Sequence, residues 1–522
     1  MVVRGHRWRE MARVGIAVLV VLAVFGVGAG SASAATPSVA ISVSPGLFPG
    51  FSAALTDYVV RCTPGTPVRV QVTTGGDATV AVDGGPARRG RFSVAVSLNP
   101  GQEFKIVTSG SNGFGGAYYV RCLPVDFPQW SVNRPGSPQA QFYVMAPTFR
   151  TGGFSPDGHY VVVMNNYGVP VWWYYDNNGM PGDVKLLSNN DIAWSTLGAN
   201  IGTGGATGQV HALDGSLVHL ISAASFSPYN QSIDFHDFQL LPNGNYLIQG
   251  VYRRQADMSH YCYTDANGTH CGPANATISD DIVQELTSNG NLVWQWDAND
   301  NIPLAETSPQ WHKQVLTGGQ PFDPYHMNSA QEYGDNVLIS FRHMDAFYDV
   351  SRSSGAIVWK IGDLPRLGAG QQLQILNDPV CGSHLSGQHY ARMLPDGTVT
   401  IHDNGSNSQT CNGVSTQRAP RAVRYQLDLN AGTATVIETV SDPGAAPKSG
   451  CCGSAERLGV GANDDWVTDW GITPVTDELT PASQVVFQLQ WDGRFSYRTD
   501  AILPGRVTID ALRAGMNVQF PR

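Results

Sequence analysis

A glycine turn that leads into an apolar, often tryptophan-bearing strand recurs six times along this chain of 522 residues. A second, more polar turn recurs between these positions, so that a typical unit carries two hairpin signals. The first turn occurs at Gly168, Gly215, Gly290, Gly355, Gly432 and Gly493, and the second at Pro156-Asp-Gly158, Pro242-Asn-Gly244, Tyr333-Gly334-Asp335 and Pro395-Asp-Gly397. Six such units predict six four-stranded sheets.

Four-stranded sheets that repeat in this way close radially into a β-propeller with a central channel. The abundance of Gly (58 residues), the low fraction of charged residues (14%) and the lack of long helical periodicity also favour an all-β class. A long two-sheet sandwich would not need six near-equivalent units. We therefore predict a six-bladed β-propeller catalytic domain over residues 148–522, preceded by a small N-terminal β-sandwich domain.

Residues 1–34 have the features of a secretory signal peptide. Four arginines precede an apolar run over residues 14–30, and Ala32-Ser33-Ala34 is a small-residue cleavage signal. An uncleaved anchor is the alternative for this segment. We expect the mature protein to be secreted or extracytoplasmic, in the cell envelope, with no membrane contact after cleavage of the signal.

The mature chain is acidic. Removing residues 1–34 takes away four Arg and one Glu, so that the formal charge changes from −10 to −13. An acidic chain without basic clusters argues against nucleic acid and anionic membrane surfaces as partners.

Residues 36–127 are expected to form a separate, immunoglobulin-like β-sandwich, because alternating apolar strands are separated there by Gly and Pro turns. A Pro-rich linker over residues 128–147 then leads to the repeats. The oligomeric state and the role of the N-terminal domain do not follow from the sequence.

Eight cysteines in an exported chain predict four disulfides. Cys62 and Cys122 lie in matched segments of the N-terminal domain, and Cys262 and Cys271 would close a loop. The remaining four allow three pairings that the sequence does not distinguish: Cys381, Cys411, Cys451 and Cys452. A metal–thiolate site is the alternative, but no two cysteines have the CxxC spacing.

His236, His326 and His389 each lie eight residues before the glycine of a polar turn. Equal offsets in repeated units predict equivalent positions in space, so the three imidazoles should meet near one end of the channel. Arg342 lies eight residues after Gly334, as His326 lies eight before it, and hairpin pairing should bring these two side chains together.

Three imidazoles and a guanidinium suit a group with concentrated negative charge, such as a sulfuryl or phosphoryl group. Arginine can hold two oxygens in a fork geometry, and histidine can act as nucleophile, acid or hydrogen-bond donor. Strand alternation predicts that His343 faces away from Arg342, and that Asp237 faces away from the channel, where it would support His236 indirectly.

Two other functions remain open. Three convergent histidines can bind zinc or iron in a metal-dependent propeller enzyme, although a neighbouring arginine disfavours a dication and no carboxylate shares the offset. Alternatively, the propeller could be a non-catalytic module that binds carbohydrate or a cell-wall polymer.

At these residues the chain resembles the PAPS-independent arylsulfotransferase (aryl-sulfate sulfotransferase) family of exported six-bladed propellers. The resemblance covers roughly residues 140–500 and is carried by His236-Asp with Leu241-Pro-Asn-Gly-Asn245, His326-Met-Asn328-Ser329, Ser340-Phe-Arg342-His343 and Gln388-His389. The insertions 255–280 and 405–420 depart from the better-known members and indicate a divergent branch.

The resemblance implies that His389 is the nucleophile and becomes transiently sulfated. It further implies that His326 and Arg342 hold the sulfuryl oxygens and that His236 supports the group or moves a proton. We expect Asn328 and His343 to contact the substrate. The expected partners are a small aryl sulfate donor and a phenolic acceptor, and neither a cofactor nor a metal is expected.

Overall fold

The computed structural model describes residues 36–151, 158–197, 207–224, 231–362 and 368–522. The expected signal peptide and the start of the turn before Gly158 lie outside the described residues. Within these ranges the regular secondary structure is nearly all strand, which confirms the all-β class. None of the helices in the described ranges is long and apolar enough to cross a membrane.

Two sheets form the N-terminal domain and share one buried hydrophobic cluster. Val68, Val70 and Val72 of one strand are buried while their neighbours are exposed, as expected for a strand with one face on a core. The Cys62–Cys122 disulfide lies in the same cluster. The sheets contain β1 (Ser38–Ser44), β4 (Val68–Gly75) and β6 (Arg91–Val96), and β2 (Leu47–Phe48), β3 (Asp57–Arg61), β8 (Gly115–Leu123), β7 (Glu103–Ser109) and β5 (Thr79–Val82).

The described strands of the larger domain include six sets of four antiparallel strands, each of which we call a blade. From the innermost strand outward, the first three are β38 (Arg494–Ile502), β10 (Phe142–Arg150), β11 (Tyr160–Asn165) and β12 (Pro170–Tyr175); β13 (Met180–Leu186), β14 (Ile192–Leu197), β15 (Thr207–His211) and β16 (Leu217–Ile221); and β17 (Gln231–Leu240), β18 (Tyr246–Ala256), β21 (Ala276–Leu286) and β22 (Leu292–Asp297).

The other three blades are β23 (Met327–Tyr333), β24 (Asn336–Phe341), β25 (Ala346–Ser351) and β26 (Ile357–Gly362); β28 (His389–Met393), β29 (Thr398–Asp403), β32 (Arg421–Asp428) and β33 (Thr433–Val440); and β34 (Ser454–Arg457), β35 (Trp466–Asp469), β36 (Val475–Leu479) and β37 (Val485–Trp491). β27 (Gln371–Leu376) pairs in parallel with both β26 and β33 and so joins two blades.

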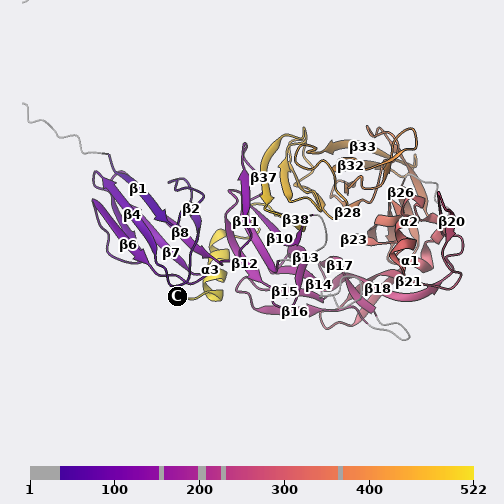
Figure 1. Ribbon diagram of the computed structural model, residues 1–522, viewed down its shortest axis with the longest axis horizontal. Helices are drawn as coiled ribbons and strands as arrows, with labels where there is room; N and C mark the ends of the chain where they lie inside the picture. The colour runs from indigo at the N-terminus through magenta and orange to yellow at the C-terminus, as the bar shows by residue number, and fades with distance from the viewer. Residues whose placement is uncertain (1–35, 152–157, 198–206, 225–230, 363–367) are drawn as a thin grey trace, which may run out of the picture.

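The innermost strands close a ring. β38, β13, β17, β23, β28 and β34 each contact the next in this order, and β34 contacts β38 again. In Figure 1 the labels β38, β13, β17, β23 and β28 surround the middle of the larger domain. The ring is closed by β38, from the end of the chain, which pairs with β10 near the start of the domain.

The predicted turns lie between strands, with two differences. All six glycines of the first turn have positive φ, which glycine adopts without steric cost. Five of them join the third and fourth strands of a blade, but Gly493 lies between β37 and β38, which belong to different blades. The second difference concerns Arg150, which lies eight residues before Gly158, as the three histidines lie before their turns. It ends β10, the second strand of its blade, because β38 takes the innermost place.

The segment 128–147 contains β9 (Trp130–Asn133), which pairs with β37, and the beginning of β10. Two short hairpins fall in or near the insertions: β19 (Cys262–Asp265) with β20 (Gly268–Cys271), and β30 (Ser408–Gln409) with β31 (Ser415–Thr416). The described helices are α1 (Ala298–Asn301), α2 (Pro309–Gly318) and α3 (Ile509–Gln519), with the 3-10 turns η1 (Leu304–Glu306) and η2 (Arg342–Met344).

α3 lies between the two domains (Figure 1). Leu512 and Met516 are buried in a cluster that also contains Trp172 and Trp173 of the first blade. On the other side of the helix, Arg513 pairs with Asp57 of the N-terminal domain, with Nη2 and Oδ2 2.7 Å apart. The C-terminal helix therefore attaches the smaller domain to the propeller.

Candidate active site

The four residues expected to be catalytic all lie at or beside innermost strands. His236 is within β17, His326 directly precedes β23, and His389 begins β28. Arg342 follows β24, and its backbone N–H donates to the His326 carbonyl oxygen at 2.8 Å. The two residues are therefore adjacent, as predicted. The pairing at the turn alone would place His343 opposite His326, and a register shift between Met327 and Ser329 brings Arg342 there instead.

The imidazoles of His236, His326 and His343 lie side by side. The ring centroids of His236 and His326 are 5.1 Å apart, and those of His326 and His343 are 4.7 Å apart. The prediction that His343 faces away from Arg342 is wrong: Arg342 Nη1 donates to His343 Nε2 at 2.7 Å. Strand alternation does not hold there because Arg342–Met344 form a 3-10 turn.

His389 is buried, with 1% of its surface exposed. Its Nδ1 lies 2.9 Å from the Gly387 carbonyl oxygen and 2.8 Å from Asn404 Oδ1, and both of these atoms are acceptors. The proton therefore resides on Nδ1, and Nε2 keeps its lone pair. Burial, together with the nearby Arg342 and His236, lowers the pKa of His389 well below its usual value. The ring is consequently neutral.

His236 and His326 have a different kind of partner. Asp234 Oδ1 accepts a hydrogen bond from His236 Nδ1, and Asp323 Oδ2 accepts one from His326 Nδ1 at 2.5 Å. Burial lowers the pKa of His236, and the Asp234 carboxylate offsets part of this effect. The sequence prediction missed both aspartates, although each lies two or three residues before its histidine.

Arg342 is held on three sides. Its guanidinium carbon lies 4.2 Å from the ring centroid of Trp311, its Nη1 binds His343, and its Nη2 donates to the Gly450 carbonyl oxygen at 2.9 Å. Burial lowers its pKa to about 10, so the group stays charged near neutral pH. Its buried Nε has no hydrogen-bond partner among the described residues.

Asn328 lies behind His389. Its Nδ2 donates to the Gln388 carbonyl oxygen at 2.7 Å, and its side chain is fully buried. The Gln388 side chain in turn donates to the carbonyl oxygens of Phe341 and Ala346. These bonds fix the start of β28 relative to η2, and hence His389 relative to Arg342.

Asp237 faces the interior of the ring, contrary to the prediction from alternation. A register shift between Ile233 and Phe238 of β17 breaks the alternation at this point. The Asp237 carboxylate pairs with Lys185, Arg392 and Arg498, and it accepts from the Ala330 N–H. These partners come from β13, β28, β38 and β23, so Asp237 connects five of the six innermost strands.

All eight cysteines form disulfides, as predicted. The pairs that the sequence left open are Cys381–Cys411 and the adjacent pair Cys451–Cys452. The Cys452 N–H donates to His389 Nε2 at 3.2 Å, which places the second pair in the site. The sequence prediction did not include this segment, and the Cys-Cys dipeptide between glycines was the available signal.

One group of residues in the described ranges could hold a metal ion. The ligand atoms of Asp323, His326 and His343 all lie within 4.8 Å of one another. This set differs from the three histidines expected for a metal enzyme, because it lacks His236 and His389 and contains a carboxylate. Arg342 donates to His343 Nε2, which occupies one potential ligand atom.

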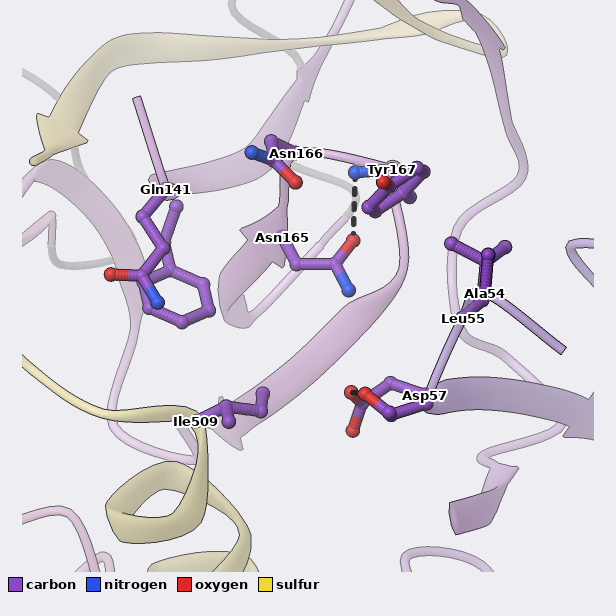
Figure 2. Close-up of a pocket in the computed structure, with 10 residues that line it drawn as sticks. Ala54, Leu55, Asp57, Gln141, Asn165, Asn166, Tyr167 and Ile509 are labelled. Atoms are coloured by element: carbon purple, nitrogen blue, oxygen red, sulfur yellow. Dashed lines mark hydrogen bonds between the residues drawn. The ribbon is translucent and has the colours of Figure 1, made fainter. Parts of the chain in front are cut away.

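A separate pocket of about 160 Å³ lies at the junction of the two domains. Figure 2 shows Asp57 and Leu55 on one side of it, and Gln141, Asn165 and Ile509 around the rest. The side chains of the candidate active site are not among those that line it.

Three structures illustrate the similarity to solved proteins. An auxiliary nutrient binding protein from Bacteroides ovatus is 10% identical, with 88% of this chain and 90% of that chain covered and a TM-score of 0.31. The Dos1 propeller is 9% identical, with 70% and 87% covered and a TM-score of 0.31. Kuenenia stuttgartiensis hydrazine synthase is 10% identical, with 75% and 100% covered and a TM-score of 0.27. At these TM-scores the likeness carries no inference.

No curated protein sequence matches the chain significantly. The sequence profile of one family does match, over residues 183–492, a range that includes every residue of the candidate active site. That family is described as arylsulfotransferase (ASST). Because the match spans more than half of the chain and contains the site described above, this protein belongs to the arylsulfotransferase family.

Proposed function

We propose that the protein moves a sulfuryl group from a phenolic sulfate ester to another phenol through a sulfohistidine on His389. Membership of the family supports an aryl sulfotransferase activity in general. The observation that carries the mechanism is the neutral His389, whose Nδ1 faces two acceptors and whose Nε2 keeps its lone pair. An unprotonated nitrogen held in one tautomer is what a nucleophilic step requires.

In the first half-reaction, His389 Nε2 attacks the sulfur of the aryl sulfate. An N–S bond forms, the S–O bond to the aryl group breaks, and the phenolate leaves with the electron pair of that bond. The proton that the leaving oxygen gains comes from Nε2 of His236 in its protonated form, whose Nδ1–H is bonded to Asp234. That carboxylate favours the protonated form and offsets part of the effect of burial.

In the second half-reaction, a phenol takes the first product's place and attacks the same sulfur. Its proton passes to His236, the new S–O bond forms, and the electron pair of the N–S bond returns to His389. Each half-reaction therefore restores the groups that the other has used, and no external cofactor enters the balance.

Arg342 offsets the negative charge that gathers on the sulfuryl oxygens. Its charge is retained despite burial, and its Nε has no partner in the described part of the chain. Contacts with Trp311 and with the Gly450 carbonyl fix its direction before substrate arrives. Preorganised donors of this kind stabilise a transition state without a reorganisation cost. His326, next to Arg342, donates a second hydrogen bond to the sulfuryl oxygens.

The reaction fits an extracytoplasmic site. Four disulfides are typical of proteins that fold outside the cytoplasm. A sulfuryl donor in the form of a phenolic ester would give such an enzyme its substrate without a cytoplasmic nucleotide.

The direct test uses the metal-free mature protein with 4-nitrophenyl sulfate, in the presence and absence of phenol. We expect nitrophenol release that depends on phenol, and a loss of at least about 1000-fold in His389→Ala because the nucleophile is gone. His270→Ala is the matched control, since that side chain is 42% exposed on the β19–β20 hairpin. Unchanged turnover in His389→Ala would defeat the mechanism.

A second candidate is favoured by the Asp323, His326 and His343 group, which could hold a metal ion. In that case the purified protein would contain stoichiometric zinc or iron, and chelation would remove the activity. Full phenol-dependent turnover by protein without bound metal would exclude this candidate.

A further inference from the structure

Residues 449–453, with the sequence Ser-Gly-Cys-Cys-Gly, form a loop that we call the cysteine-pair loop. It contacts three side chains at the candidate site. Arg342 Nη2 donates to the Gly450 carbonyl oxygen, and the Cys452 N–H donates to His389 Nε2. Asn404, which also binds His389 Nδ1, donates to the Cys452 carbonyl oxygen at 2.9 Å. The loop is thus bonded to both the proposed nucleophile and the proposed anion-binding group.

Covalent and steric constraints hold the Cys452 N–H in one direction. The Cys451–Cys452 disulfide closes a small ring that contains the peptide bond between the two residues, and the N–H of that bond faces His389. Cys452 is buried, with a φ of 67° that side-chain-bearing residues rarely adopt. A Cβ at Gly453 would lie only 2.7 Å from His402 Nε2, so the chain packs tightly behind the ring.

The chemistry of His389 changes the acceptor of this N–H. In the free enzyme the N–H is bonded to the Nε2 lone pair. When that lone pair forms the N–S bond, it can no longer accept a hydrogen bond. The same event brings three sulfuryl oxygens next to the N–H, which is buried and has no access to bulk water.

We propose that the Cys452 N–H is a catalytic donor to a sulfuryl oxygen, and that the Cys451–Cys452 disulfide keeps it aimed at that oxygen. This inference rests on the proposed function. The N–H and Arg342 then form a pair of donors positioned by one loop, since Gly450 anchors Arg342 and Cys452 faces His389. Backbone N–H groups act in this way in other acyl- and group-transfer sites.

The test measures the first half-reaction alone, by rapid mixing with 4-nitrophenyl sulfate in the absence of phenol. The double variant Cys451→Ser with Cys452→Ser keeps the N–H but lacks the ring. We expect its burst rate to fall by about 10-fold or more while KM changes less than about twofold, because the donor acts in the transition state. The matched control is Cys262→Ser with Cys271→Ser, which removes a disulfide from the β19–β20 hairpin.

If the double variant does not fold, the wild-type protein is reduced under native conditions with a phosphine and then reoxidised. The disulfide accepts two electrons and two protons to give two thiols, and peptide mapping establishes which pairs have opened. A burst that slows when Cys451–Cys452 opens and recovers on reoxidation supports the proposal. A burst at the wild-type rate in the opened protein overturns it. If the oxidised wild type gives no burst, the proposed function fails instead.

Discussion

The three histidines of the site differ in what their Nδ1 atoms contact, and this difference separates their chemistry. His389 faces a backbone carbonyl and an amide, which fix its tautomer without adding charge. His236 and His326 face carboxylates. The Asp234 carboxylate favours the protonated form of His236 and offsets part of the effect of burial on its pKa, so this histidine is suited to donate a proton, whereas His389 is suited to attack.

We predict that Asp234→Asn slows turnover in a manner that depends on the leaving group. The neutral amide no longer favours the protonated form of His236, so proton donation to the leaving oxygen weakens. The rate with phenyl sulfate should fall by about 10- to 100-fold, and the rate with 4-nitrophenyl sulfate much less, because nitrophenolate leaves without a proton. Steady-state rates with both esters check this.

The comparison of the two esters in Asp234→Asn is the control for that prediction. An equal loss with both esters would mean that Asp234 only supports the local structure. Asp323→Asn changes the equivalent carboxylate at His326, which we assign to hold the sulfuryl group. Asp323→Asn should therefore lower the rates with phenyl sulfate and with 4-nitrophenyl sulfate by similar factors.

At the scale of strands, Asp237 joins the ring of blades at its centre. Burial alone would raise the pKa of its carboxyl, but Arg392, Lys185 and Arg498 together hold this pKa below its ordinary value. These cations come from three different innermost strands, and Asp183 also pairs with Lys185 and Arg498. The two carboxylates together therefore balance the positive charge at this point.

We predict that Asp237→Ala destabilises the propeller by about 3–5 kcal/mol, the typical cost of breaking a buried ion pair from one side. Thermal unfolding followed by circular dichroism checks this. Lys313→Ala is the control, since Lys313 is 60% exposed in its pair with Asp265 and should contribute at most about 1 kcal/mol. Equal melting temperatures for the two variants would contradict the central role of Asp237.

The strand pattern also explains which parts of the site the sequence could predict. The turn at Gly334 fixes the pairing of β23 with β24 to within one residue, so the proximity of His326 and Arg342 could be predicted from spacing, although a register shift near Met327 sets the final register. The directions of His343 and Asp237 depended on a 3-10 turn and a register shift, neither of which has a signal in residue spacing. The cysteine-pair loop comes from another part of the ring. It is too far from the histidines in sequence for the spacing around a hairpin turn to predict their contact.

At the scale of the whole molecule, several buried or half-buried carboxyl groups have raised pKa values. Burial raises the pKa of Glu456 and Asp280 to about 8, and that of Asp469, Asp477 and Glu478 to about 7. In the unfolded chain the same groups titrate near pH 4. The folded protein therefore holds protons near neutral pH that the unfolded chain has already released.

We predict from this that stability falls as the pH rises from about 7 to about 8.5. A group with a raised folded pKa favours folding fully below its unfolded pKa, and this contribution is lost as the pH passes the folded value. The buried His343 and His389 oppose the trend only slightly, because their pKa values are lowered and the unfolded value lies near 6.5. They are therefore neutral in the folded protein and largely neutral in the unfolded chain above about pH 7. The melting temperature should fall by about 2–5 °C across this window.

Glu456→Gln isolates one contributor. The amide keeps an acceptor for the Ala501 N–H but has no proton to lose, so the excess of the variant's melting temperature over that of the wild type should be larger at about pH 8.5 than at about pH 6.5. Differential scanning calorimetry at both pH values measures the two differences. A wild-type melting temperature that stays level or rises between them would show that these carboxyl groups are already ionised in the folded protein. A uniform loss in Glu456→Gln at both values would assign the side chain a packing role without a titration effect.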